Sequence, residues 1–236
     1  MAAAAAKCGA MATIEHLPDS LLGTVLACLG KDRAAAALLV SKRWHRVFLS
    51  DPALWRQFSI GHPAPVLQLA LLQRVGGLVS SLSIDNTVEQ QAEVVACLQP
   101  ARLQDLLLWH AEPQLVAALP RFSNLTLLCI GTIEDDMPAG MDVALLALPH
   151  LRNLSLTNSS IAETVAAAVA TCAQLTQLWL RTDRFEQPRA LRQLTRLCQL
   201  NSISLLAAGE DACLHAPEPA LLPALETFEL RRNARS

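Results

Sequence analysis

The chain has 236 residues, of which 52% are hydrophobic and 17% charged, and its formal net charge is −2. This composition excludes an intrinsically disordered chain, and the length accommodates one or two domains. The small net charge gives no overall field that would favour nucleic acid or an acidic membrane surface as a partner. The longest uncharged runs, 57–73 and 164–180, fall short of the roughly 18 residues that a transmembrane helix requires.

Cysteine usage and the N-terminus indicate the compartment. The seven cysteines are scattered and include no C-x-x-C pair, so we expect no zinc site and a reducing, cytoplasmic or nuclear, environment. Residues 1–13, MAAAAAKCGAMAT, contain one basic residue and no apolar run typical of a signal peptide. We therefore predict a disordered alanine-rich tail over 1–13.

The stretch 17–55 has the pattern of a small helical cluster. The dipeptide Leu17-Pro18 suits a helix entry, apolar residues follow at helical spacing, and Gly30 stands where that helix would end. Further helices are predicted over 33–40, after Ser41, and after Asp51. About 40 residues is near the lower limit for independent folding, so we expect a partner or a neighbouring domain to cover one face.

This stretch resembles the F-box. The resemblance is carried by Leu17-Pro18, the ladder of apolar residues after it, Val40-Ser41-Lys42-Arg43-Trp44, Asp51 and Leu54-Trp55, and it implies docking on the Skp-type adaptor of a cullin-RING ubiquitin ligase. Arg33 departs from the family, which usually has an aliphatic residue there. The alternative is an amphipathic three-helix bundle without such a partner. The predicted adaptor-binding residues are Leu17, Pro18, Leu21, Leu22, Val25, Leu26, Leu29, Val40, Trp44, Leu54 and Trp55.

The remainder of the chain is periodic. We assign 14–60 to the F-box, 61–77 to a linker with a flanking helix over 66–75, and 78–236 to a solenoid of about seven repeats. The pattern L-x-x-L-x-L starts at Val79, Leu103, Leu125, Leu151, Leu175, Leu200 and Leu225. This spacing resembles leucine-rich repeats, which run roughly 20–29 residues. The predicted fold class is therefore α/β, with parallel strands and with helices or irregular returns such as 161–172 and 189–197.

Two features depart from a regular leucine-rich repeat. The asparagine or cysteine expected after each third leucine is not regular, so the repeat subtype stays open. No polar cap is visible after the seventh strand, although terminal repeats normally need one. We expect that strand to be exposed, to pair with another chain, or to belong to a truncated product.

Alternate strand positions predict which side chains face a target on the concave side of the sheet. Trp109 and Trp179 fall there, three strands and roughly 15 Å apart, and exposed tryptophans are typical of binding surfaces. Alternatively, irregular strand exits or the F-box region could cover both rings. The predicted target-binding residues are Asp105, Leu107, Trp109, Leu127, Trp179 and Arg181.

Several other groups of polar residues are candidate sites. Arg181 is a candidate for an acidic or phosphorylated target, whereas Arg189, Arg192 and Arg196 fit the solvated face of a return helix better. The acidic loop 131–142 lacks calcium-loop spacing and is expected to be a solvated insertion. The six histidines occupy separate segments, and no phosphate-binding loop or G-x-S-x-G is present, so we predict no catalytic site, cofactor or metal.

Two functions follow from these patterns. The first is the substrate-recognition subunit of an SCF-type ubiquitin ligase, which binds the Skp-type adaptor, and the cullin and RING protein through it, with its F-box and a target protein with its repeats. The second is a scaffold that binds proteins without ubiquitin transfer. Neither involves nucleic acid or a membrane.

Overall fold

The computed structural model describes residues 14–31, 36, 39–61, 65–85, 88, 91–131, 138–185, 193–207 and 223–232. The predicted tail 1–13, most of the predicted helix 33–40, and the centre of the acidic loop 131–142 lie outside these residues, as do Arg189 and Arg192. The chain divides into two compact units, Met1–Trp55 and Arg56–Ser236. Each unit is described by itself.

The first unit is helical, as its sequence predicts. Its elements are η1 (Ile14–His16), α1 (Asp19–Leu29), α3 (Lys42–Ser50) and α4 (Pro52–Trp55). Gly30 ends α1 with a φ of 76°, a left-handed conformation that glycine adopts without a steric penalty. The Ser41 hydroxyl accepts a hydrogen bond from the Trp44 backbone N–H at 3.3 Å and so caps α3. The start signals read from the sequence are therefore confirmed for α1 and α3.

Aromatic rings dominate the core of the first unit. Phe48 and Trp55 meet edge to face with ring centroids 5.0 Å apart, and the Trp55 indole N–H donates to the Phe48 carbonyl at 2.6 Å. Leu22 and Leu26 of α1 are fully buried. Gly23 lets the Asp51 side chain approach α1, because a Cβ at residue 23 would lie 1.6 Å from Asp51 Oδ2.

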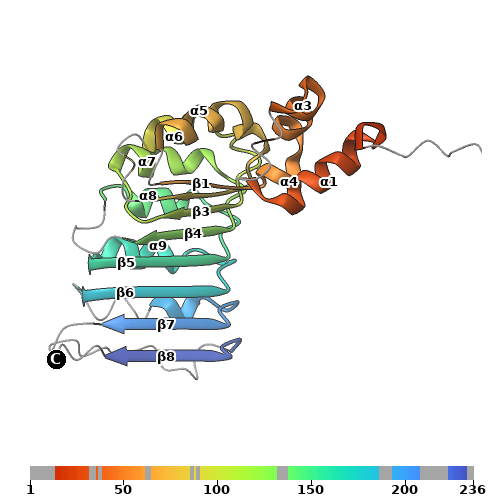
Figure 1. The fold of residues 1–236 in the computed structure, drawn as a ribbon. Coiled ribbons are helices and arrows are strands. Elements are labelled where there is room, and N and C mark those ends of the chain that lie inside the picture. The colour runs from red at the N-terminus through yellow and green to blue at the C-terminus, as the bar shows by residue number, and fades with distance from the viewer. Residues whose placement is uncertain are drawn as a thin grey trace, which may run out of the picture. The chain divides into compact units, whose positions relative to one another are not determined.

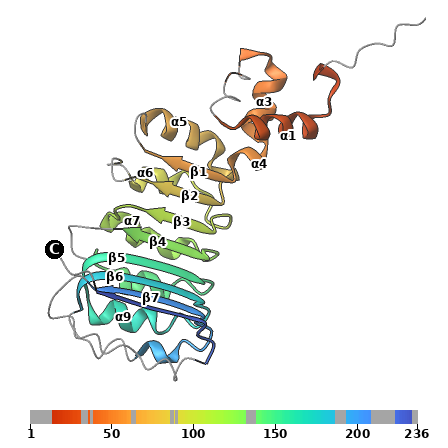
Figure 2. The same ribbon diagram turned by 60° about the horizontal axis from the view of Figure 1, so that its bottom comes forward.

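The second unit is one parallel sheet with helices on one side (Figures 1 and 2). In the described residues its eight strands follow one another in chain order. The strands are β1 (Gln57–Ile60), β2 (Ser81–Ile84), β3 (Asp105–Leu108), β4 (Leu127–Gly131), β5 (Asn153–Ile161), β6 (Gln177–Phe185), β7 (Ser202–Ala207) and β8 (Thr227–Arg232). The helices are α5 (Pro65–Val75), η3 (Gly76–Leu78), α6 (Gln91–Ala96), α7 (Pro113–Ala118), η4 (Leu119–Arg121), α8 (Met141–Leu146) and α9 (Glu163–Val169).

This arrangement confirms the predicted α/β leucine-rich-repeat solenoid. The seven strands expected from the L-x-x-L-x-L pattern all form, and α5 ends beside Gly76 as predicted. The first strand, β1, is additional and comes from a stretch that the sequence analysis assigned to the F-box. Its pattern is the same, with Trp55, Phe58 and Ile60 in place of leucines, and it starts 24 residues before Val79. A search for leucines alone overlooks it.

The core of the second unit lies between the sheet and its helices. The second and third leucine positions of the repeats, such as Leu82 and Ile84 of β2 and Leu106 and Leu108 of β3, are almost completely buried. Since each repeat packs on its neighbours, burial accumulates along the stack. None of the helices in the described part of the chain is long and apolar enough to cross a membrane.

At one strand exit, a buried glutamine makes backbone hydrogen bonds in place of the asparagine expected in a regular repeat. The Gln91 amide donates to the His110 carbonyl at 2.9 Å and accepts from the Glu112 backbone N–H at 3.1 Å. It therefore satisfies the strand exit of the following repeat from the return helix α6. The repeat pattern predicts this function at the strand exit itself and therefore does not identify Gln91.

Candidate functional site

Helix α1 divides its apolar side chains between two faces. Leu22 and Leu26 point into the core, whereas Leu21, Val25 and Leu29, four residues apart, are 37–51% exposed. We call these three residues the outer α1 stripe. Pro18 just before the helix is exposed too.

The eleven predicted adaptor-binding residues thus separate into two groups. The interior group is buried and consists of Leu22, Leu26, Trp44, Leu54 and Trp55. The surface group consists of the outer α1 stripe with Leu17, Pro18 and Val40, of which Leu17 is half-buried and the others are exposed. The periodic pattern located both groups but does not say which group faces solvent.

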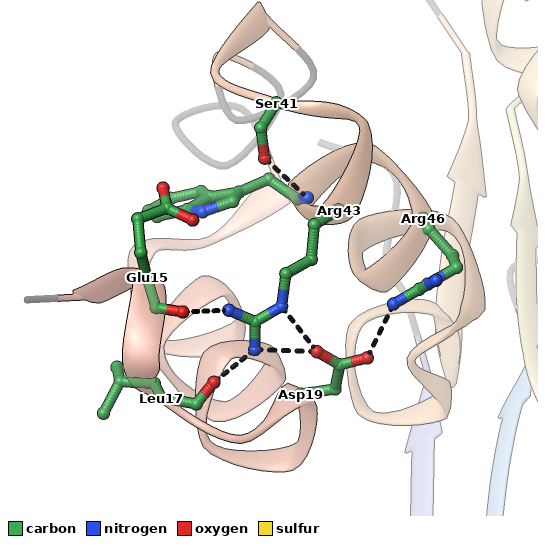
Figure 3. Close-up of polar contacts among 7 residues, drawn as sticks. Glu15, Leu17, Asp19, Ser41, Arg43 and Arg46 are labelled. Carbon is green, nitrogen blue, oxygen red and sulfur yellow. Dashed lines mark hydrogen bonds and ion pairs between the residues drawn. The ribbon is translucent and has the colours of Figure 1, made fainter.

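A network around Arg43 fixes the start of α1 (Figure 3). The Arg43 guanidinium donates to the Glu15 carbonyl at 2.6 Å, to the Leu17 carbonyl, and to Asp19 Oδ1 at 2.8 Å. Arg46 donates to the other Asp19 oxygen at 3.1 Å. The backbone just before Pro18 is therefore held by one side chain of α3.

Charge explains the state of Asp19. The hydrogen bond from Arg43 is the largest influence and holds the pKa of this carboxyl below its ordinary value of 3.8. Desolvation opposes this shift, and the weaker hydrogen bond from Arg46 lowers the pKa further. In the sequence, Arg43 stands out only as part of a motif, and Asp19 was not predicted as its partner. An acidic residue in the first turn of α1 and a basic segment 24 residues later are visible in the sequence, but their contact is tertiary.

On the second unit, the sheet side opposite α6–α9 presents the alternate strand residues to solvent, and we call it the open face. Trp109 and Trp179 are 61% and 54% exposed there, although tryptophan side chains in proteins are on average mostly buried. Leu107, Leu127 and Cys129 are half-buried beside them. Two exposed indoles with half-buried apolar side chains beside them mark a candidate binding surface.

The strand register places the two tryptophans in different rows. Trp179 shares its row with Ser155, Cys129 and Leu107, as the pairing of β3 to β6 shows. Trp109 follows the end of β3 and belongs with Gly131, Thr157 and Arg181, two residues further along the strands. Three strand spacings and two residues along a strand separate the rings by about 16 Å.

Charged side chains on the open face lie on separate strands. Asp105 pairs in register with Leu127, and Asp85 follows β2 beside the Trp109 position. Arg181 lies on β6, two residues after Trp179, and is exposed. All six predicted target-binding residues therefore lie on this one face. Asp85, Cys129 and Gly131 belong to the same surface, which strand register reveals.

The described residues hold several cysteines but no cluster of metal-ligating side chains. In the residues that the structure describes, no group of three or more His, Cys, Asp and Glu side chains could hold a metal ion. Within the same residues, Cys28, Cys97, Cys129, Cys172 and Cys198 are free thiols.

Comparisons with known proteins agree with part of this description. Residues 14–61 match the family model described as F-box-like. Among solved structures, an internalin from Listeria monocytogenes is similar, with a TM-score of 0.45 and 15% sequence identity over 78% of this chain and 51% of the internalin. The chain thus spans about half of that protein, and a likeness of this degree transfers no function. No curated protein matches the chain significantly.

Proposed function

From an F-box-like domain at residues 14–61 joined to a leucine-rich-repeat solenoid, we propose that the chain is the substrate-recognition subunit of an SCF-type cullin-RING ubiquitin ligase. The observation that carries the proposal is the presence of two exposed apolar surfaces on two separate units. The outer α1 stripe serves the adaptor, and the open face serves the target.

The adaptor surface consists of the surface group defined above. Half-exposed aliphatic side chains such as Leu21 and Leu29 each contribute about 1 kcal/mol when a partner buries them. The interior group acts indirectly, because Trp44, Trp55 and the buried leucines fix the position of α1. The Arg43 network then holds Leu17-Pro18 against the start of that helix.

The chain itself performs no covalent chemistry in this proposal. The adaptor links it to a cullin and a RING protein, and the solenoid holds the target near the charged conjugating enzyme. The rate increase comes from a raised effective concentration of the target lysine. The free thiols fit a reducing compartment, so we place the protein in the cytoplasm or nucleus.

Affinity purification of the full chain with three multiple-site variants tests the division of labour. Replacement of Leu21, Val25 and Leu29 by serine should remove adaptor and cullin and keep the target. Replacement of Trp109 and Trp179 by alanine should do the reverse. Serine at Val143 and Leu146, which are exposed on α8, is the matched control and should change neither.

The purification also distinguishes a ligase subunit from a scaffold. A ligase subunit requires that a cullin co-purifies and that the bound target becomes ubiquitinated in the reconstituted complex. Adaptor binding that survives loss of the whole outer α1 stripe would contradict the proposed docking surface. Target binding without any ubiquitin transfer would favour the scaffold function.

A further inference from the structure

Two adjacent strands in the middle of the open face carry small side chains between the two exposed indoles. We call four of these residues the low strip: Cys129 and Gly131 of β4 with Ser155 and Thr157 of β5. All four are half-buried. Trp109, just after β3, and Trp179 of β6 flank the low strip, one on each side, and both rings are more than half exposed.

The width between the flanking strands matches a helix. Strands β3 and β6 are three strand spacings apart, which is about 14 Å. Side chains stand roughly perpendicular to a sheet, so two indole rings leave about 11 Å between them after their own thickness is subtracted. An α-helix with its side chains is about 10–12 Å across. One helix that lies along the strands therefore fills the space.

The hydrogen bonding of the sheet also favours a helix over an extended segment. Strands β4 and β5 each pair with a neighbouring strand on both sides, so their backbone groups are used within the sheet. An extended segment laid on this face would find no main-chain partners, because strand addition requires a free sheet edge. A helix satisfies its backbone N–H and C=O groups internally.

Charge restricts the kind of helix. Strands β4 and β5 contain no charged residue, so the helix surface that they cover has to be uncharged as well. Arg181 is exposed on β6, two residues after Trp179, and can pair with a carboxylate on the flank of the helix. Other charges lie on β2 or β8, outside the flanking strands, or at the opposite end of β3: Asp85, Glu229 and Asp105.

We propose that the open face binds an amphipathic α-helix of the target protein, which lies along the low strip with one indole on each side. The proposal rests on the target-binding role of the open face and adds the conformation of the bound segment. The rows from Asp105 to Trp109 cover about 13 Å, or about nine residues of helix. Because the helix is covered below and on both flanks, its apolar positions are i, i+1, i+4, i+5 and i+8.

Fluorescence polarisation with two labelled 16-residue peptides of equal composition tests the conformation. The first has leucines at positions 4, 5, 8, 9 and 12, and a lactam bridge between Lys and Glu at positions 6 and 10 fixes the helix. The second has leucines at positions 3, 5, 7, 9 and 11 and no bridge. The full-length chain should bind the helical peptide at least about tenfold more tightly. Equal affinities, a preference for the second peptide, or no binding of either would overturn the proposal.

A matched pair of serine substitutions tests the position of the helix. Ser155 of β5 and Ser83 of β2 occupy the same row and are both half-buried, but Ser83 lies outside the flanking strands. Ser155→Leu raises the low strip and should weaken binding of the helical peptide at least about tenfold, whereas Ser83→Leu should change it less than about twofold. Equal effects of the two substitutions would contradict the position.

Nuclear magnetic resonance of the first peptide without its bridge, bound to the native chain, reports the conformation directly and needs no variant. Transferred Overhauser contacts between Hα of one residue and the amide proton three residues later are expected, and contacts confined to neighbouring residues would refute the helix. Affinity purification separates this proposal from the proposed function. A target that is lost with the tryptophan variant and retained by Ser155→Leu would refute the bound helix and leave the open face as the target surface.

Discussion

Arg43→Ala should weaken adaptor binding although we do not place Arg43 in the adaptor surface. Its guanidinium holds the carbonyls of Glu15 and Leu17, which both lie just before the entry to α1. Without these bonds the segment before Pro18 loses its fixed position relative to α1. The outer α1 stripe is then unchanged, but the segment before Pro18, which belongs to the same adaptor surface, is no longer held in place.

The magnitude follows from the contacts. Hydrogen bonds to a charged group contribute about 1.5–3 kcal/mol when buried. The Arg43 side chain is 27% exposed, so we assign about 1 kcal/mol to each of the two bonds with backbone carbonyls. A total of about 2 kcal/mol corresponds to a roughly 30-fold increase in the Kd of the adaptor.

Calorimetric titration of the purified chain with adaptor measures this change. Arg46→Ala is the matched control, because Arg46 is 69% exposed and contacts only Asp19 in the network, so its loss should change Kd by less than about threefold. Hydrogen exchange should accelerate at residues 14–18 in Arg43→Ala and remain unchanged in α3. Equal Kd values for the two variants, or an unchanged Kd for Arg43→Ala, would refute the reasoning.

Four further predictions concern stability and reactivity. Gly76→Ala should destabilise the solenoid by about 2 kcal/mol, because the new Cβ would lie 2.2 Å from the Cys97 carbonyl oxygen. Gly77→Ala is the control, because its new Cβ would meet nothing within 4 Å and should leave the midpoint of urea unfolding unchanged. Equal midpoints for the two variants would contradict the packing. Gln91→Leu should cost about 2 kcal/mol in the same assay through the unpaired Glu112 N–H, against almost nothing for the exposed Gln114→Leu. Because the pKa of Asp19 is lowered in the folded state, the contribution of this carboxylate to stability is present above pH 3.8 and is lost as pH falls below that value. In acid titrations, the difference in unfolding free energy between the native chain and Asp19→Asn should therefore shrink below pH 3.8. A constant difference would argue against the ion pair. Burial raises the pKa of the Cys172 thiol to about 11, so mass spectrometry should find Cys28 and Cys198 alkylated in the native protein and Cys172 only after unfolding.

Periodicity made most of the fold predictable. A spacing of 22–26 residues between L-x-x-L-x-L patterns specifies parallel strands that stack in order, because each repeat buries its leucines only against its neighbours. The same rule located Trp109 and Trp179 on one face. It missed β1, whose aromatic residues occupy the leucine positions.

The sequence by itself thus determined the F-box pattern, the α/β solenoid and the face that carries the candidate target residues. Only the tertiary structure decided which α1 residues are exposed, since a ladder of five apolar residues spans more than one helix face and the packing of Trp44 and Trp55 selects the side that is covered. The Arg43 network and the Gln91 contacts likewise join residues about 20 or more positions apart, through geometry that no local pattern encodes. Register, which the pairing of neighbouring strands fixes, placed the two tryptophans in different rows of the sheet and Arg181 in the row of Trp109.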